Sequence, residues 1–316
     1  MQLKRVVVVG AGAVGGSIGG LLADTDVRVT LVARGEHGAA LRRDGLSLRM
    51  PDRAVWIAPP CVGRVDEVSW RSGDVALVAT KLQDAVPALD ALLDAAGPGL
   101  PVVCAFNGIH GEQWAKERFD TVLSMLVWMP ATHLDPGEVR LHSKKCRGVL
   151  DIGPYGDDDA GSPAFALAER FCVRLREAGF DAVARADITR WKHAKWITNL
   201  GGAAQALVTD DWKSVAAAAR LEGEAVLDAA GTDRVPTDEL LERCSAVTAD
   251  AVDGQRRSRG STWQSHARGQ PMESPWLEGA MADLAAVVGV PAPVNATLAA
   301  AAQGPRRLTA KEALGG

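Results

Sequence analysis

VVVVGAGAVGG, residues 6–16, joins a run of four valines to a glycine-rich turn. Consecutive β-branched residues predict a strand that is buried on both faces, as in a parallel sheet. The turn at residues 10–15 matches G-x-G-x-x-G, and apolar residues follow it at helical spacing: Val14, Ile18, Leu21 and Leu22. Strand, turn and helix therefore stand in the order that a dinucleotide-binding fold requires.

Each glycine of the turn has a separate predicted role. Gly10 permits the tight turn, Gly12 lets the backbone approach a pyrophosphate, and Gly15 lets the helix pack close to the strand. The free N–H groups at the start of the helix then face the phosphates. We expect the cofactor-binding residues here to be Gly10, Ala11, Gly12, Ala13, Val14 and Gly15. The alternative is a glycine-rich turn without a ligand, since chains rich in glycine and alanine produce this pattern by chance.

Length and composition restrict the class of protein. A chain of 316 residues suggests two domains, and 47% hydrophobic with 23% charged residues is ordinary for a globular protein. The net charge of −4 gives no reason to expect nucleic acid, and no apolar run is long enough for a membrane span or has the form of a signal peptide. The five cysteines are scattered without metal-ligand spacing. We therefore expect a reduced, cytoplasmic protein without a metal.

The second predicted strand, residues 27–34, bears on the choice of cofactor. An acidic residue at its end would bind the ribose hydroxyl of NAD, whereas an arginine accommodates the 2′-phosphate of NADP. The strand ends at Arg34, whose planar guanidinium suits a phosphate. Glu36 favours NAD but stands beyond the strand end. We predict NADPH, with a solvated surface charge as the alternative role of Arg34.

Two further buried strands end in polar residues. Residues 74–80 lead to Lys81, and residues 101–106 lead to Asn107 after an intervening helix at 84–96. Open α/β sheets bind ligands at the carboxyl ends of their strands. We therefore expect Lys81 and Asn107 to contribute to a ligand site, with Lys81 at the cofactor. The alternative for Lys81 is a solvated cation at the strand end.

The rest of the chain changes character near residue 185. The sequence predicts a hairpin at 45–62, strands at 121–134, 138–144 and 147–153 added antiparallel to the sheet, a helix at 162–179 and a last strand at 180–188. Later segments read as helix: 190–207, 215–230, 237–252 and 275–289. The predicted fold is α/β, with a Rossmann-type NADP-binding domain at 1–185 and an all-helical substrate and catalytic domain at 186–316.

With these motifs in place, the chain resembles the ketopantoate reductase (2-dehydropantoate 2-reductase) family over essentially its full length. The likeness rests on the glycine turn, Arg34, Lys81 and the segments Asn107-Gly108, EVRLHSKKCRGVLDIG (138–153), KWITN (195–199) and STWQSHARGQPMESPWLEG (261–279). The resemblance implies a catalytic lysine at Lys195 with Glu273 as its acidic partner, and substrate-binding residues at Asn107, Asn199 and Ser261. It also implies that Asn107 contacts the cofactor.

The chemistry of these residue types agrees with that implication. Reduction of a ketone by hydride needs a proton or a positive charge at the oxygen, and an ammonium provides both. Lys195 and Asn199 are spaced i, i+4, so a helix presents them on one face. The ordinary alternatives are an exposed helix cation for Lys195, a surface amide for Asn199, an N-cap for Ser261 and a surface carboxylate for Glu273.

Two departures from the family pattern concern the substrate. Ala203 stands where the family usually has another asparagine, and His193 stands where a tryptophan usually precedes the lysine. The resemblance implies NADPH-dependent reduction of a small 2-keto acid, 2-dehydropantoate to pantoate, as in pantothenate biosynthesis. The alternatives are a reductase of the same fold acting on a different ketone in specialised metabolism, or a non-catalytic NADPH-binding sensor. We also expect a homodimer.

Overall fold

The structure is a computed structural model that describes residues 3–156, 159–257 and 259–315. The chain divides into two compact units. The first unit contains Met1–Phe106, Gly111–Thr189 and Leu241–Arg257, and the second contains Asn107–His110, Arg190–Leu240 and Ser258–Gly316. Two short segments thus belong to a different unit from their neighbours in the sequence, which composition alone does not reveal. The single boundary at 185/186 stays a prediction.

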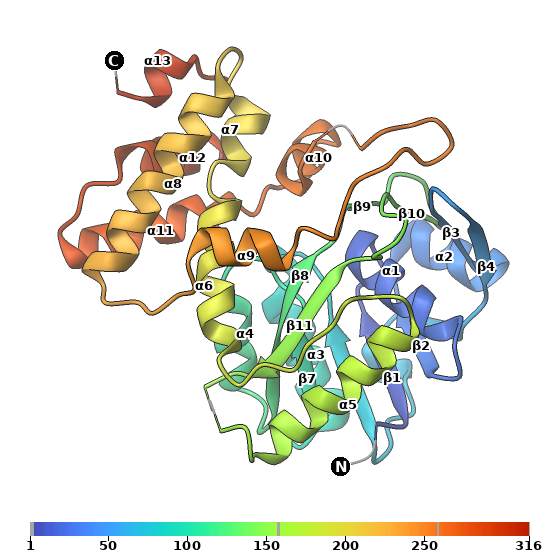
Figure 1. The fold of residues 1–316 in the computed structure, drawn as a ribbon. Coiled ribbons are helices and arrows are strands. Elements are labelled where there is room, and N and C mark those ends of the chain that lie inside the picture. The colour runs from blue at the N-terminus through green and yellow to red at the C-terminus, as the bar shows by residue number, and fades with distance from the viewer. Residues whose placement is uncertain (1–2, 157–158, 258, 316) are drawn as a thin grey trace. The chain divides into compact units, whose positions relative to one another are not determined.

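A seven-stranded sheet forms the centre of the first unit (Figure 1). Its order is β11-β8-β7-β6-β1-β2-β5, and every neighbouring pair is parallel except β11 with β8. The strands are β1 (Arg5–Val9), β2 (Arg28–Val32), β5 (Cys61–Val62), β6 (Asp74–Val78), β7 (Val102–Cys104), β8 (Val122–Trp128) and β11 (Val149–Pro154). The central position of β1, with parallel neighbours on both sides, confirms the predicted Rossmann-type arrangement.

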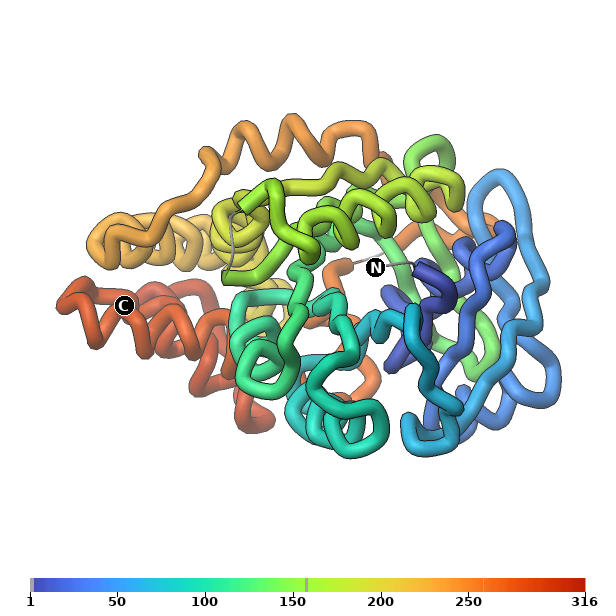
Figure 2. Tube along the Cα trace, turned by 90° about the horizontal axis from the view of Figure 1, so that it is seen from below, coloured from blue at the N-terminus to red at the C-terminus, as the bar shows by residue number. Residues whose placement is uncertain are grey.

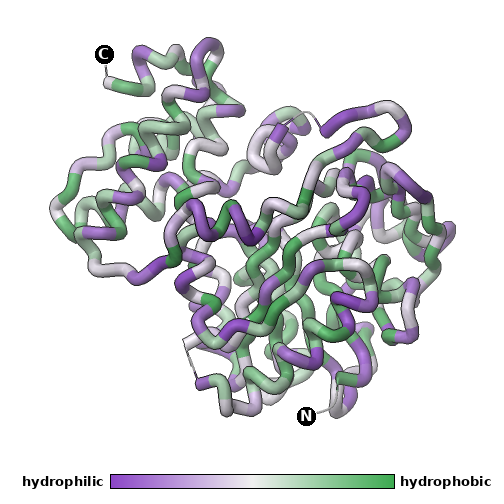
Figure 3. The backbone as a smooth tube through the Cα atoms, in the orientation of Figure 1, coloured by the Kyte–Doolittle hydropathy of each residue, from purple (hydrophilic) through white to green (hydrophobic). Residues whose placement is uncertain are grey.

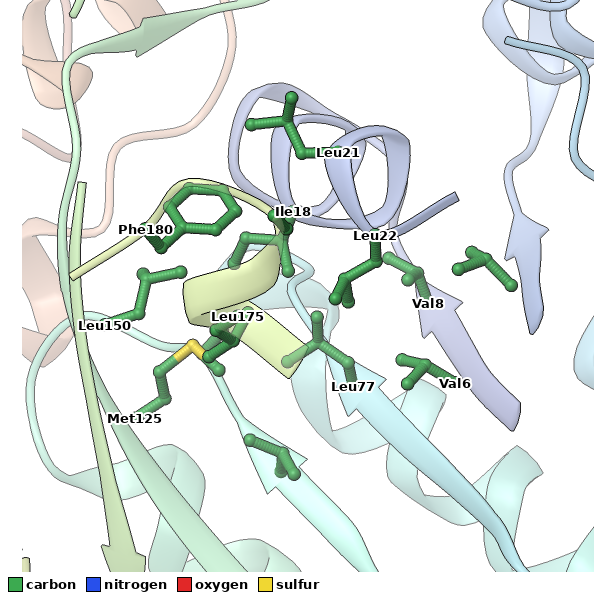
Figure 4. Packing of buried hydrophobic residues seen from close by; sticks show 14 of the residues in the cluster. Val6, Val8, Ile18, Leu21, Leu22, Leu77, Met125, Leu150, Leu175 and Phe180 are labelled. Carbon is green, nitrogen blue, oxygen red and sulfur yellow. The ribbon is translucent and has the colours of Figure 1, made fainter. Parts of the chain in front are cut away.

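Apolar side chains cover both faces of this sheet. Val6 and Val8 of β1 pack in one cluster with Ile18 of α1 (Ala13–Ala23) and Leu175 of α5 (Pro163–Glu177), as Figure 4 shows. The view from below in Figure 2 shows α3 (Ala85–Ala96) on the other side of the sheet from α5. Strands covered on both faces need continuous apolar sequence, which explains the valine runs.

A second sheet of four strands corrects one part of the prediction. β3 (Leu46–Arg49) and β4 (Ala54–Ile57) form the expected hairpin, but β10 (Glu138–Leu141) pairs parallel with β3 and antiparallel with β9 (Ala131–Thr132). The prediction that 138–144 joins the main sheet is therefore wrong. The burial pattern explains the difference, because only alternate residues of β10 are fully buried, as in a sheet with one covered face.

The predicted strand at 180–188 is also wrong. Only isolated bridges form there, from Asp181 to Val149 and from Ala184 to Ile152, and they run parallel to β11. The remaining helices before this segment are α2 (Gly35–Asp44) and α4 (His110–Lys116), with 3-10 turns at Val65–Glu67 and Leu82–Asp84.

The later part of the chain is helical, as predicted. The helices are α6 (Ile188–Asn199), α7 (Gly202–Leu207), α8 (Trp212–Ala229), α9 (Thr237–Arg243), α10 (Ser261–Ala267), α11 (Glu278–Val288), α12 (Pro293–Ala301) and α13 (Ala310–Ala313), with a 3-10 turn at Ser274–Trp276. The predicted helix 190–207 is broken at Gly201, which has a φ of 85°. A side chain at Gly201 would meet the Cβ of Ala216 at 2.5 Å, so this break lets α8 approach closely.

The predicted helix at 237–252 ends early, at Arg243. The chain beyond it belongs to the first unit, where Ala249 forms an antiparallel bridge with Ser143. Figure 3 shows hydrophobic and hydrophilic residues mixed along the 237–252 segment, whereas the strands of the main sheet are mostly hydrophobic, with Asp74 in β6 and Asp151 in β11 among the exceptions. Within the described residues, none of the helices combines the length and apolar character needed to cross a bilayer.

A buried ion-pair network holds this returning segment to the first unit. Asp151 of β11 is fully buried and accepts hydrogen bonds from Arg243 at 2.6 Å and from Arg185 at 2.6 Å. Arg243 also pairs with Asp181 at 2.5 Å. A buried carboxylate that loses one such partner is destabilising, because less of its charge is then compensated.

Replacing Arg243 with glutamine should therefore lower the free energy of unfolding by about 3 kcal/mol, measured by urea denaturation. The control is Arg64→Gln, which removes an exposed pair with Asp66 and should leave stability unchanged. Equal effects of the two substitutions would show that the buried network does not stabilise the first unit.

Candidate active site

The glycine turn has the geometry that the sequence predicts for its packing. Gly10 has a φ of 95°, and a Cβ there would lie 2.9 Å from the backbone nitrogen of Thr80. A Cβ at Gly15 would overlap the carbonyl oxygen of Gly10, so the helix approaches the strand too closely for any side chain. At Gly12, in contrast, a Cβ would meet nothing within 4 Å. The protein's own packing does not require glycine at position 12, but a ligand lying on the turn would.

Cationic and polar groups stand at the neighbouring strand ends of the first unit. Arg34 is the N-cap of α2, and its exposed guanidinium lies 3.2 Å from the carboxylate of Asp84. Exposed pairs of this kind contribute little to stability, so an incoming phosphate can compete for the arginine. Lys81 is half-buried just after β6, at the start of the 3-10 turn Leu82–Asp84.

Thr80 is a candidate cofactor residue that the sequence analysis missed. Its hydroxyl oxygen is buried without a hydrogen-bond partner among the described residues, and its methyl group and backbone nitrogen lie beside Gly10. Buried polar atoms are nearly always satisfied, so an unsatisfied hydroxyl next to a glycine turn fits a site built for a polar ligand. The signal in the sequence was its position immediately before Lys81, at the end of a buried strand.

Alanine substitutions at two glycines separate ligand binding from folding. Gly12→Ala should leave Tm unchanged, because the new methyl group meets no protein atom, but should weaken dinucleotide binding tenfold or more, about 1.4 kcal/mol. Gly15→Ala should destabilise the protein by about 1–3 kcal/mol through overpacking. Fluorescence titration and thermal unfolding measure the two effects, and unchanged affinity in Gly12→Ala would contradict the assignment of the turn.

In the second unit, three predicted site residues lie in contact. The ammonium of Lys195 donates to the side-chain oxygen of Asn107 at 3.1 Å, and the amide nitrogen of Asn107 donates to Glu273 at 3.4 Å. Lys195 is 6% exposed and Glu273 is 3% exposed. Buried charges occur where they are paired or hydrogen-bonded. The Asn107 amide therefore joins an ammonium and a carboxylate that are both largely removed from water.

Neighbouring residues fix the positions of this trio. Trp196 follows Lys195 on α6, and its indole N–H donates to the carbonyl of Leu277 at 3.1 Å. Leu277 lies four residues after Glu273 and closes the 3-10 turn Ser274–Trp276. The tryptophan is 2% exposed, so it packs α6 against the segment that carries the glutamate. This contact sets the separation between the lysine and the carboxylate.

The two remaining predicted residues lie on different helices of the same unit, Asn199 on α6 and Ser261 on α10. Asn199 is the last residue of α6, and its side-chain nitrogen is buried without a partner among the described residues. Ser261 begins α10, with Gly260 rather than a side chain as the cap. Gly202 lies against Thr262, since a Cβ there would be 2.8 Å from the threonine hydroxyl. An unsatisfied amide at the end of the lysine helix is suited to bind a substrate oxygen.

Ala203, which stands where the family usually has an asparagine, contacts a buried glutamate in the structure. Ala203 is fully buried, and its backbone N–H donates to the side chain of Glu278 at 3.1 Å. Glu278 is itself fully buried, and this burial raises the pKa of its carboxyl, although hydrogen bonds from Ala203 and other groups oppose the shift. The sequence analysis missed Glu278, because a glutamate at the start of an apolar helix reads as a surface residue.

The substitution Glu278→Gln tests whether the buried carboxyl of Glu278 lowers stability when it is charged. The folded protein holds the carboxyl proton more tightly than the unfolded chain does, so stability is lost as pH rises above the ordinary range of a glutamate. Glutamine keeps an acceptor for Ala203 and carries no charge. The Tm of Glu278→Gln at about pH 8 should exceed that of the unsubstituted protein by about 2–4 °C, the shift expected for a gain of about 1 kcal/mol in the free energy of unfolding. This gain should shrink toward about pH 4.

The control for Glu278→Gln is Asp283→Asn, at an exposed position of the same helix, which should not change Tm. A lower Tm for Glu278→Gln at both pH values would show that the carboxylate is stabilising in its charged form.

Comparison with known proteins is consistent with this arrangement. Residues 6–157 match the sequence profile described as "Ketopantoate reductase PanE/ApbA", and residues 187–305 match "Ketopantoate reductase PanE/ApbA C terminal". A relative from Halobacterium salinarum named 2-dehydropantoate 2-reductase is 30% identical, over 93% of this chain and 96% of its own. One from Pyrococcus horikoshii with the same name is 26% identical, over 99% of both chains.

Solved structures share the fold. The PanE/ApbA family ketopantoate reductase from Ralstonia eutropha has a TM-score of 0.76 at 23% identity, with 95% of this chain and 97% of that chain covered. D-Mandelate dehydrogenase, solved with NADH and anilino(oxo)acetate, has a TM-score of 0.78 at 20% identity, with the same coverage. The two profiles and the relative at 30% identity place the chain in an oxidoreductase class. The chain belongs to the ketopantoate reductase family.

Proposed function

We propose that this protein reduces a small 2-keto acid to the 2-hydroxy acid with NADPH, and that 2-dehydropantoate is the substrate. The observation that carries the proposal is the buried contact of Lys195 with Asn107 and of Asn107 with Glu273. A surface cation would not be 6% exposed and hydrogen-bonded to an amide that also binds a carboxylate. The names of the relatives support the choice of substrate.

The residues of the first unit fit a nicotinamide dinucleotide. The open space at Gly12 and the unsatisfied hydroxyl of Thr80 suit a pyrophosphate with its ribose, and Arg34 suits a 2′-phosphate. When bound, such a cofactor supplies the hydride that reduces the ketone carbon. Because the backbone of Arg34 is the N-cap of α2, the positive end of that helix dipole adds to the positive charge of this part of the first unit.

Lys195 would act at the ketone oxygen. As hydride reaches the carbon, the C=O π bond breaks and negative charge develops on the oxygen, which takes a proton from the Lys195 ammonium to give the hydroxyl. The resulting amine recovers its proton from solvent. Asn107 holds the ammonium through its side-chain oxygen, and Glu273 holds Asn107, so the donor is oriented before substrate arrives.

Substrate binding would use the second unit's hydrogen-bond donors. The side-chain nitrogen of Asn199, which has no partner in the part of the chain that the structure describes, and the hydroxyl of Ser261 are suited to the keto acid's carboxylate and carbonyl oxygens. Ala203 favours a second candidate, a ketone other than 2-dehydropantoate, because an alanine methyl cannot replace the donor of the family's usual asparagine. A non-catalytic NADPH sensor is the third candidate, but a sensor needs no buried proton donor.

The test is turnover of a panel of 2-keto acids, from 2-dehydropantoate to branched and aryl compounds, with NADPH and with NADH in parallel. We expect the highest kcat/KM for 2-dehydropantoate with NADPH. Preference for another ketone would support the second candidate. If NADPH binds but no compound is turned over, the result would support the third candidate, a non-catalytic NADPH sensor.

Replacing Lys195 with methionine should lower kcat/KM by about 10²–10⁴-fold, the usual contribution of a positioned acid. The Kd of NADPH is measured alongside and should be retained, which separates lost chemistry from misfolding. Tm should fall, because Glu273 then stays buried without the nearby ammonium. Lys213→Met, at an exposed position of α8, is the control and should keep full activity. Undiminished activity in Lys195→Met would refute the proposed role of the lysine.

A further inference from the structure

A histidine that the proposed reaction does not use contacts the glycine turn. His37 lies in the first half of α2, three residues after Arg34. Its Nε2 lies 2.8 Å from the carbonyl oxygen of Ala11, and its Nδ1 lies 2.9 Å from the backbone nitrogen of Gly137. All of these residues belong to the first unit. The imidazole therefore bridges the glycine turn and the turn between β9 and β10.

The two partners determine where the ring carries its proton. The Gly137 N–H can only donate, so Nδ1 accepts, and the single proton of a neutral ring is on Nε2. Nε2 then donates to Ala11. Burial, together with the nearby His133, lowers the pKa of His37, which agrees with a neutral ring. His37 is thus held in one tautomer and one orientation by two backbone groups.

The contact with Ala11 acts on the peptide that matters for phosphate binding. The carbonyl of Ala11 and the N–H of Gly12 belong to the same peptide unit, and the structure has no cis peptides in its described residues. In a planar trans peptide these two groups point in opposite directions. Holding the Ala11 carbonyl on His37 therefore turns the Gly12 N–H away from the histidine. That N–H is at the N-cap of α1, where N–H groups have no intrahelical partner.

The other side of the ring rests on a well-anchored support. Gly137 is buried, and its carbonyl accepts a hydrogen bond from Ser47 of β3 at 2.8 Å. The His133 ring lies against His37 with centroids 4.1 Å apart, and its Nδ1 donates to the carbonyl of Glu138 at 3.0 Å. The four-stranded sheet thus fixes His37 from the side opposite to the glycine turn.

We propose that His37 is a positioning residue for the dinucleotide, holding the Ala11–Gly12 peptide so that the Gly12 N–H is aimed at the pyrophosphate. The inference rests on the proposed function only in requiring that the glycine turn binds a dinucleotide. It assigns a role in cofactor affinity to a side chain outside the G-x-G-x-x-G pattern. It also gives the four-stranded sheet a part in cofactor binding, as the support of that side chain.

The experiment compares three substitutions of His37 in the full-length protein. Glutamine places an N–H donor near the position of Nε2, so it can still bind Ala11. Asparagine is shorter and places its oxygen near the position of Nδ1, so it keeps the contact with Gly137 but not that with Ala11. Leucine keeps neither. The Kd of NADPH is measured by fluorescence titration, with Tm, KM for NADPH and kcat measured on the same preparations.

We expect His37→Leu and His37→Asn to raise the Kd and the KM for NADPH about tenfold, with kcat at saturating NADPH unchanged. His37→Gln should stay within about threefold of the unsubstituted protein. Asp44→Asn, at an exposed position in the last turn of the same helix, keeps both contacts of His37, so it is the matched control and should change Kd little. If His37→Leu does not fold, the comparison of glutamine with asparagine still decides the question.

Equal affinities in all variants, or equal losses in His37→Gln and His37→Asn, would overturn the role of His37. These results differ from those that would overturn the proposed function. If the variants bind NADPH in the expected order but the protein reduces no keto acid, the role of His37 is supported and the proposed reductase activity is refuted. A protein that binds neither NADPH nor NADH would refute both.

Discussion

Two opposite charges, an ammonium and a carboxylate, are nearly removed from water in the second unit and are joined by one amide. An isolated charge in an apolar interior carries a large desolvation penalty, so Lys195 and Glu273 need polar contacts that persist in the folded state. Asn107 is suited to this position because its side chain has an acceptor for the ammonium and a donor for the carboxylate. A leucine there would satisfy neither group, and an aspartate would repel the glutamate. The helix packing around Trp196 and the turn before α11 can be understood as the framework for this contact.

The first unit was largely predictable because its determinants are local. A valine run, three glycines at fixed spacing and a helical apolar stripe specify β1, the turn and α1 within about twenty residues, and the structure has them as expected. Strand partners were less predictable. β10 alternates as expected for a strand, but its pairing with β3 depends on which surface of α1 is left to cover, and no local pattern encodes this. The predicted end of the helix beginning at 237 was wrong in a similar way: α9 ends at Arg243, which pairs with Asp151 and Asp181, residues far away in the sequence that no local pattern identifies.

In the candidate site, too, some residues could be predicted from local sequence and others only from the packing of the folded chain. Lys195 and Asn199 could be placed on one helix by spacing, and the resemblance to a family indicated Asn107 and Glu273 before any geometry was known. Three other residues of interest gave no such signal. Thr80, His37 and Glu278 each look unremarkable in the sequence, and their interest comes from an unsatisfied hydroxyl, a bridged peptide and a buried carboxyl, which are properties of packing. Ala203 shows the converse, since its departure from the family pattern was visible in the sequence but its contact with Glu278 was not.

The grouping of residues 107–110 with the second unit has a consequence for dissecting the molecule. Asn107 lies shortly after β7, in the sequence of the first unit, so a gene fragment encoding the first 185 residues would carry this amide away from its partners. The complementary fragment would contain Lys195 and Glu273 with no side chain between them to satisfy both. Neither half would hold the complete donor assembly, whichever of them folded. Reduction would then depend on an uncut chain, even though the nucleotide fold and the helical bundle have separate hydrophobic cores.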